Sequence, residues 1–300
     1  MDMKFAITGG AGFIGSNTHH YFSSCGDELL VIDKKQPNFN LENFIQADIS
    51  DQDIVYHIDD FKPDCIINFA SQSKFDHYDS VVTDVLGTTN ILNICKKKQI
   101  KLCHISTQEV YGPYDGKPSV ETDKLNPVQP SAAIKASSDL LIKSYYNRHK
   151  TDYIIIRLSN NYGYAQNEQD FLPKLINSII DKKSFHLEDV QQKKDFIYVE
   201  DTSKIIRNLL LKEKKWKSIY NVGSGQFHTN LELTEQVIKA YKKITNKDIS
   251  FDNIVKIQSN HQYNDQKYLM SIKKLHSHIK VNYTDFHTGI LKTVKSYVNE

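Results

Sequence analysis

A glycine-rich turn near the start of the chain constrains the fold more than any other feature. It follows the apolar run at 3–8 and precedes a helical pattern over 13–24, and it contains Gly9, Gly12 and Gly15. In a strand-to-helix turn of this kind the first glycine adopts a positive φ, the second lets the backbone touch a pyrophosphate, and the third lets the helix lie close to the sheet. The sequence therefore predicts a dinucleotide site at the N-terminus of the first helix.

Short apolar runs alternate with longer periodic segments, which is typical of successive βα units. We therefore predict an α/β fold with a doubly wound parallel sheet of the Rossmann type. The expected strands cover 3–8, 28–33, 64–69, 101–106, 152–158 and 219–222. The expected helices cover 13–24, 83–98, 131–149, 171–181, 201–212, 230–243 and 286–298. Four prolines between 113 and 130 predict a loop beside a cleft, because proline removes a donor and blocks helix continuation.

The charge balance excludes several classes of function. Lys and Arg number 38 and Asp and Glu 36, a net charge of +2, which argues against a nucleic-acid partner. The apolar runs are too short for a membrane span, and the first residues lack the pattern of a secretory leader. Four scattered cysteines fit a reducing compartment better than a disulfide or zinc framework. We therefore expect a cytoplasmic protein without a metal site, a nucleic-acid partner or a membrane partner.

An acidic residue at the end of the second expected strand indicates the cofactor. Asp33 lies 18 residues after Gly15. A carboxylate at this place accepts a hydrogen bond from the adenosine ribose and repels a 2′-phosphate, which favours NAD over NADP. The adjoining Lys34 weakens that preference slightly. NAD is the predicted cofactor.

Further motifs follow the glycine turn along most of the chain. They occupy, in order, 9–15 (GGAGFIG), 33–34, 47–49, 69–73, 106–112, 135–139, 157–163, 194–201 and 220–223. With these motifs the chain resembles the extended short-chain dehydrogenase/reductases of the NAD-dependent epimerase/dehydratase family. Within that family it looks most like the dTDP-glucose type of nucleotide-sugar 4,6-dehydratases.

The resemblance implies two domains and a homodimer. Residues 1–165 with the returning segment 191–226 would bind NAD, and 166–190 with 227–300 would form a smaller α/β domain that binds the nucleotide sugar. The two copies of the dimer would meet through the expected helices that begin at 83 and 131.

The resemblance also implies which residues contact each ligand. The implied cofactor contacts are Gly9, Gly12, Phe13, Ile14, Gly15, Asp33, Lys34, Asp48, Ile49, Phe69, Ala70, Ser71 and Lys135. The implied substrate contacts are Ser73, Asn160, Leu172, Lys194 and Gln266. Lys194 and Gln266 stand where these dehydratases often carry arginine, so the diphosphate is expected to be held more weakly or differently. A loop with Gln266 and Tyr268 is expected to face the substrate.

One departure from the family pattern concerns proton transfer. Enzymes of this family place a tyrosine four residues before a lysine, because i and i+4 share one helix face and the ammonium lowers the pKa of the phenol. Lys135 is that lysine, but Ser131 stands four residues before it. An aliphatic hydroxyl is far less acidic than a phenol and is a poor acid or base at neutral pH. The usual proton shuttle is therefore missing.

Two further departures are Gln108 and Asp84. Gln108 occupies the place of an aspartate that protonates the leaving C6 hydroxyl in the dTDP-glucose enzymes, and an amide cannot do this. Asp84 stands where asparagine is usual, which would alter the internal proton path. Thr107, which would bind the sugar 4-oxygen, and Glu109, which would be the C5 base, agree with the resemblance. The candidate catalytic residues are therefore Thr107, Gln108, Glu109, Ser131 and Lys135.

Three functions stay open. The first is a 4,6-dehydratase-like enzyme for a dTDP- or UDP-hexose, in which tightly bound NAD oxidises C4, Glu109 removes the C5 proton, water leaves C6 and the hydride returns to C6. Lys135 would stabilise charge, and Glu109, a water held by Ser131 or a tyrosine from elsewhere would replace the phenol. The second is another C4-oxidising epimerase, dehydrogenase or isomerase. The third is a non-catalytic dimer that binds NAD or a nucleotide sugar.

Overall fold

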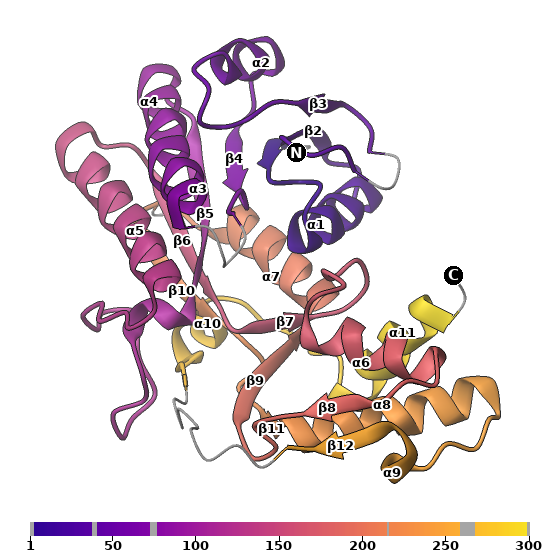
Figure 1. The fold of residues 1–300 in the computed structure, drawn as a ribbon. Helices are drawn as coiled ribbons and strands as arrows, with labels where there is room; N and C mark the ends of the chain where they lie inside the picture. Colours follow the sequence, from indigo (N-terminus) through magenta and orange to yellow (C-terminus); the bar gives the residue numbers. More distant parts are fainter. Residues whose placement is uncertain (1–2, 38–40, 73–76, 215, 259–267, 299–300) are drawn as a thin grey trace.

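A parallel sheet forms the centre of the N-terminal part of the molecule (Figure 1). The computed structural model describes residues 3–37, 41–72, 77–214, 216–258 and 268–298. Within them seven strands lie in the order β10-β6-β5-β4-β1-β2-β3, and each neighbouring pair is parallel. The strands are β1 (Lys4–Thr8), β2 (Glu28–Asp33), β3 (Phe44–Gln46), β4 (Cys65–Asn68), β5 (Lys101–Thr107), β6 (Tyr153–Leu158) and β10 (Ser218–Val222).

Helices cover both faces of this sheet, so the predicted doubly wound fold is confirmed (Figure 1). On one face α1 and α7 pack with Phe5 and Ile7 of β1. On the other face α2, α4 and α5 pack with Ala6 of the same strand. This alternation follows from the two-residue period of a strand, and it explains why most residues of the central strands are apolar. The helices are α1 (Phe13–Ser24), α2 (Ile54–Phe61), α4 (Thr88–Lys98), α5 (Pro130–His149) and α7 (Val199–Lys212).

The strand order reverses beside β1. The chain runs from β1 to β2 on one side of it, and β4 then pairs on its other side. The carboxyl ends of parallel strands meet at one edge, and the register places Thr8 opposite Asn68, and Asn68 opposite His104. Ligands of open α/β sheets bind at such a reversal, outside the carboxyl ends of the strands.

A second hydrophobic core lies in the C-terminal part of the chain. Helices α6 and α11 pack with α8 there, beside two small sheets of order β11-β9-β7 and β12-β8 (Figure 1). The strands are β7 (Asn160–Tyr162), β8 (Phe185–Leu187), β9 (Lys193–Tyr198), β11 (Phe227–Thr229) and β12 (Val255–Ile257). The helices are α6 (Phe171–Ile180), α8 (Asn230–Thr245), α9 (Phe251–Ile254), α10 (Lys273–His278) and α11 (Phe286–Val298). No helix of the described chain is long and apolar enough to cross a membrane.

The helix expected at 83–98 differs from a regular α-helix. A short helix α3 (His77–Ser80) leads into a π-helix, η1 (Val81–Gly87), which continues as α4. A second short element, the 3₁₀-helix η2 (Gln108–Tyr111), follows β5 directly. The expected loop ends one residue early, because Pro130 is the first residue of α5, where a missing N–H costs nothing.

Candidate active site

The glycine turn after β1 is shaped by steric limits on its backbone. Gly9 has φ +71°, and a Cβ on it would lie 2.5 Å from the backbone nitrogen of Ala70. A Cβ on Gly15 would collide with the carbonyl oxygen of Gly9. Neither position therefore accepts a side chain without movement of the backbone.

The N-terminus of α1 presents free donors beside this turn. The first hydrogen bond within the helix runs from the N–H of Ser16 to the carbonyl of Gly12, 2.9 Å away. The N–H groups of Phe13, Ile14 and Gly15 precede it and have no carbonyl to reach within the helix. The helix dipole adds a partial positive charge at this end. The cradle and its donors fit the pyrophosphate of a dinucleotide.

A cavity of about 700 Å³ extends from the turn along the end of β2. Asp33 lines it and holds the turn, because its Oδ2 accepts the N–H of Ala11 at 3.0 Å. Lys34 and Asp48 also line it, with 3.9 Å between Lys34 Nζ and Asp48 Oδ2. Asp33 thus lies where it could accept a hydrogen bond from an adenosine ribose, as the sequence predicts.

A second cavity, of about 570 Å³, begins at the same turn and continues past β5 and α5. Thr107 at the end of β5, Glu109 on η2, and Ser131 and Lys135 on α5 all line it. Thr107 caps η2, since its Oγ1 accepts the N–H of Glu109 at 3.3 Å. This cap fixes the backbone from which the Glu109 side chain projects.

The structure gathers most of the predicted site residues around the two cavities. Every predicted cofactor contact lines one of them or both. Three of the predicted substrate contacts, Asn160, Leu172 and Lys194, line the 570 Å³ cavity. Gln108 is buried, and the described lining of that cavity does not include it. Ser73 and Gln266 lie outside the described residues.

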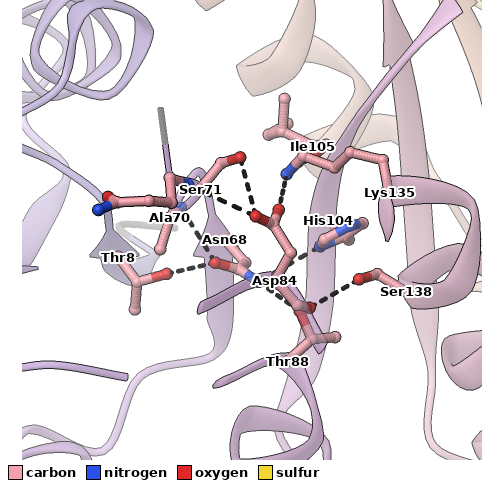
Figure 2. Close-up of polar contacts among 11 residues, drawn as sticks. Thr8, Asn68, Ala70, Ser71, Asp84, Thr88, His104, Ile105, Lys135 and Ser138 are labelled. Carbon is pink, nitrogen blue, oxygen red and sulfur yellow. Dashed lines mark hydrogen bonds and ion pairs between the residues drawn. The ribbon is translucent and has the colours of Figure 1, made fainter. Parts of the chain in front are cut away.

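Lys135 is held by a carboxylate rather than left open to the cavity. Its Nζ lies 2.7 Å from Oδ1 of Asp84 and 3.3 Å from the carbonyl of Ile105. The Asp84 side chain is 3% exposed and that of Lys135 is 15% exposed. Figure 2 shows Asp84 between Ser71, whose hydroxyl donates to Oδ2 at 3.1 Å, and Lys135.

A second set of buried polar side chains lies beside this pair and begins at Thr8, directly before the glycine turn (Figure 2). Asn68 accepts the hydroxyl of Thr8 at 2.8 Å and lies 3.3 Å from Nδ1 of His104. Burial, and then the charge of Lys135, hold the pKa of His104 well below its ordinary value of 6.5. His104 is therefore neutral at neutral pH, and the Asn68 amide places its proton on Nε2.

A tyrosine from the C-terminal part of the chain, Tyr268, feels the charge of a residue in this site. Burial, and then the charge of Glu109, raise the pKa of the Tyr268 phenol. Its segment is anchored nearby, because Met270 forms a β-bridge with Ser119 and packs against Tyr111. A phenol whose pKa is raised stays protonated, so Tyr268 can donate a hydrogen bond but is a poor base.

Sequence reasoning missed some residues of the cavity walls. Asp170, at the N-cap of α6, lines both cavities, and Asn230 and Leu233 of α8 line the 570 Å³ cavity. An aspartate directly before an apolar helical pattern is a recognisable helix start, but nothing local connects it to a turn more than 150 residues earlier. Among the described residues, no three His, Cys, Asp or Glu side chains cluster as a metal site would.

Comparison with known proteins identifies the family. The model of the NAD dependent epimerase/dehydratase family matches residues 5–223. A low-salt glycan biosynthesis protein, Agl12, of Haloferax volcanii is 34% identical over 79% of this chain and 82% of its own length. A dTDP-glucose 4,6-dehydratase of Actinoplanes is 30% identical over 98% of both chains.

A solved structure shares the whole fold. The dTDP-glucose 4,6-dehydratase of Bacillus anthracis in complex with NAD superposes with a TM-score of 0.87. It is 28% identical and covers 99% of this chain and 97% of its own. Together with the NAD-shaped cradle at the glycine turn, the family match shows that this chain is an NAD-dependent member of the epimerase/dehydratase family of short-chain dehydrogenase/reductases.

Proposed function

We propose that the protein is a 4,6-dehydratase-like enzyme that acts on a dTDP- or UDP-hexose. The observation that carries the proposal is the 570 Å³ cavity, which joins the N-terminus of α1 to Thr107, Glu109, Lys135 and Asn160. A cofactor held at the turn and a sugar held at Thr107 would then share one space. The relatives named dTDP-glucose 4,6-dehydratase support this reading.

Glu109 is the proposed C5 base. It lines the cavity on a short 3₁₀-helix, and its own N–H donates to the Thr107 hydroxyl, so its backbone is fixed relative to β5. Thr107 uses a lone pair in that cap, and its O–H can donate to the sugar 4-oxygen. NAD supplies the hydride acceptor and donor when it is bound. Oxidation at C4 makes the neighbouring C5 proton acidic enough for a carboxylate to remove.

The group that takes the C4 hydroxyl proton is the open part of this mechanism. Of the three candidates, Tyr268 is the least available as a base, because burial and the charge of Glu109 raise its pKa and keep the phenol protonated. Glu109 and a water held by the Ser131 hydroxyl remain, and both residues line the cavity. We assign the role to Glu109, a carboxylate of this wall, which passes the proton on to the water held by Ser131 before it removes the C5 proton.

On the nucleotide side, Asn160 and Lys194 are the proposed diphosphate contacts and Leu172 the base contact. All three line the cavity. The amide of Asn160 donates to the carbonyl of Asp195 at 3.2 Å, which fixes the side chain at the start of β7. Among the described residues, a bound diphosphate would meet one lysine and neutral donors, so a nucleotide sugar should bind with a shallow dependence on salt.

One observation favours the second candidate function, C4 oxidation without loss of water. Gln108 is 6% exposed and stands outside the described lining of the cavity. No proton donor at that position can then assist the C6 hydroxyl to leave. An epimerase or isomerase needs no such donor.

Product masses separate these functions. The purified protein is incubated with dTDP-glucose, UDP-glucose and UDP-N-acetylglucosamine, and each product is weighed by mass spectrometry. Loss of one water supports the dehydratase, and a new sugar of unchanged mass supports the epimerase. Glu109→Gln should lower turnover about 10²- to 10⁴-fold. The matched control is Glu235→Gln on the exposed face of α8. Full turnover by Glu109→Gln would overturn the assignment.

We also propose a homodimer through the outer faces of η1 and α5. Leu86 on η1 is 48% exposed and Leu140 on α5 is 56% exposed, and these two elements are neighbours. Leu140→Lys should then yield monomers in light scattering. Leu211→Lys on α7, at a leucine 43% exposed elsewhere, should not. A wild-type protein that scatters as a monomer would contradict the dimer.

We also propose a division into two domains and a cellular location. We keep the division into an NAD-binding unit of 1–165 with 191–226 and a sugar-binding unit of 166–190 with 227–300. Most buried residues agree with it, but Leu275 and Ile279 pack with the core of the large sheet, and Tyr162 and Tyr198 pack with the C-terminal core. We place the protein in the cytoplasm, since Cys65, Cys95 and Cys103 are free and buried and Cys25 is free and exposed.

A further inference from the structure

An ion pair in the wall of the 570 Å³ cavity is the feature that the proposed mechanism does not use. An ammonium has three N–H donors. The described contacts of Lys135 are an ion pair with Asp84 Oδ1 at 2.7 Å and a hydrogen bond to the Ile105 carbonyl at 3.3 Å. The other oxygen of Asp84 lies 3.1 Å from the hydroxyl of Ser71 and 3.4 Å from the N–H of Gln72. Asp84 is thereby fixed from both sides.

The backbone around Asp84 places its carbonyl and its carboxylate against α5. Asp84 sits in the middle of the π-helix, and its own carbonyl accepts the hydroxyl of Ser138 at 2.6 Å. Ser138 and Lys135 are three residues apart on α5, so they share a helix face. One face of α5 therefore meets both the carbonyl and the carboxylate of a single residue (Figure 2).

Charge explains why this carboxylate matters. A largely buried ammonium is costly unless an anion or several acceptors compensate it. Position 131 is four residues before Lys135 and lines the same cavity, yet Ser131 carries no negative charge at any ordinary pH. Asp84 supplies the charge that position 131 lacks.

We propose that Asp84 is a positioning residue that replaces an acidic group at position 131, so that Asp84 and Ser131 form one linked pair of positions around Lys135. The carboxylate neutralises the ammonium and fixes it at the cavity wall. An ammonium paired with a carboxylate acidifies a neighbouring hydroxyl less than an unpaired one does, and Glu109 is the proposed base on this wall. The inference deepens the proposed function, but it concerns charges that are present before any substrate binds.

Other ionisable groups near the pair do not supply this charge. His104 on β5 is neutral, because burial and Lys135 lower its pKa. Glu109 on η2 lines the same cavity, and Asp79 on α3 accepts the side-chain amide of Gln72 at 3.3 Å. Among the described residues, the carboxylate in contact with the Lys135 ammonium is that of Asp84.

The test introduces a phenol at position 131 and measures its acidity. Ser131→Tyr is made alone and together with Asp84→Asn. Each is titrated by ultraviolet difference spectroscopy against the parent that keeps Ser131, so that the other tyrosines cancel. With Asp84 present, the introduced phenol should titrate near the ordinary pKa of about 10. With Asp84→Asn, its pKa should fall by at least about one unit, a tenfold rise in the acid dissociation constant.

A third background shows whether Lys135 transmits the effect. With Lys135→Met, Asp84→Asn should shift the phenol much less, because the ammonium that Asp84 neutralises is absent. Equal phenol pKa values with and without Asp84, or an undiminished shift with Lys135→Met, would refute the proposal. No substrate or turnover is needed, so a failed dehydratase assay does not affect this test.

Stability provides the second measurement. Asp84→Asn leaves Lys135 buried without its anion and should lower the melting temperature, whereas Asp84→Asn with Lys135→Met should restore most of the loss. If Asp84→Asn alone does not fold, recovery of folded protein in the double variant still supports the pairing. A double variant no more stable than Asp84→Asn shows that Asp84 acts independently of Lys135, and the proposal fails.

Discussion

The two halves of the site differ in how closely they follow the family pattern. The cofactor half around Gly9 and Asp33 has all its predicted contact residues in the cavity walls. In the proton-transfer half, Asp84, Gln108 and Ser131 stand where the resemblance predicts other residue types. The reason is physical. A glycine in a tight turn is required by backbone sterics, which no neighbour can relieve, whereas a charge can be supplied from another position.

The largest effect is expected from adding one methyl group to the turn, which tests whether backbone sterics fix the cofactor half. Gly9→Ala should lower the free energy of unfolding by more than about 3 kcal/mol, since a left-handed φ costs about 1–3 kcal/mol and a clash with Ala70 is added. NAD affinity should fall more than about tenfold, a difference of about 1.4 kcal/mol. Denaturant unfolding and calorimetric titration measure the two effects.

Gly26→Ala is the matched control for this change. Gly26 has φ +82°, but nothing lies within 4 Å of the Cβ it would carry. It should lose only the conformational term and keep NAD affinity. Equal losses in both variants would show that the turn is limited by φ alone and not by its approach to Ala70.

A second change tests whether Asp33 recognises the adenosine ribose. Asp33→Asn removes the charge but keeps an acceptor for the Ala11 N–H. NAD binding should weaken by about 1.5–3 kcal/mol, the range for hydrogen bonds to charged groups. Binding of NADP should weaken less or improve, because the repulsion of its 2′-phosphate is gone. Titration of both nucleotides gives the ratio, and a ratio unchanged from wild type would contradict the role of Asp33.

The smallest expected effect is a pH dependence on the proton-transfer side. The folded protein holds the pKa of His104 well below 6.5. Just below pH 6.5, His104 therefore binds a proton in the unfolded chain but stays neutral in the folded protein. Stability should therefore fall as the pH drops below about 6.5, by at most about 1.4 kcal/mol per pH unit from this group. His104→Gln keeps an acceptor for Asn68 and should reduce that slope.

The slope is measured as a difference between two proteins. Unfolding free energies of wild type and His104→Gln are compared from pH 7 downward, which cancels the other histidines, including His19, whose pKa burial also lowers. Curves that stay parallel would mean that His104 is not the neutral, buried group described above.

Much of the fold is predictable from the sequence because its signals are local. The strand that contains Ile154 to Ile156 is a continuous apolar run, and its buried neighbours on both faces explain why. The three-residue strands β3 and β8 escape prediction, since three residues carry no usable period. The π-helix also escapes, because its pattern differs from an α-helix by a single residue.

The site divides in the same way. Gly9 and Asp33 can be identified from their spacing along the chain, whereas the pairing of Lys135 with Asp84 joins residues 51 positions apart. Asp84 is visible in the sequence as an unusual residue, but only the packing of η1 on α5 shows what it faces. The position of Tyr268 near Glu109 is a long-range fact of the same kind.

The π-helix makes the geometry of this wall depend on chain length as well as on residue type. A π-helical segment holds one residue more than an α-helix needs over the same path. Deleting one residue after Asp84, within 85–87, would let α3 run into α4 as a regular helix and turn the segment before the deletion by about 100° relative to the rest. Asp84 would then leave Lys135 even though every charged side chain was retained. Insertions and deletions here, and not substitutions alone, are a route by which relatives can gain or lose a carboxylate at the same lysine.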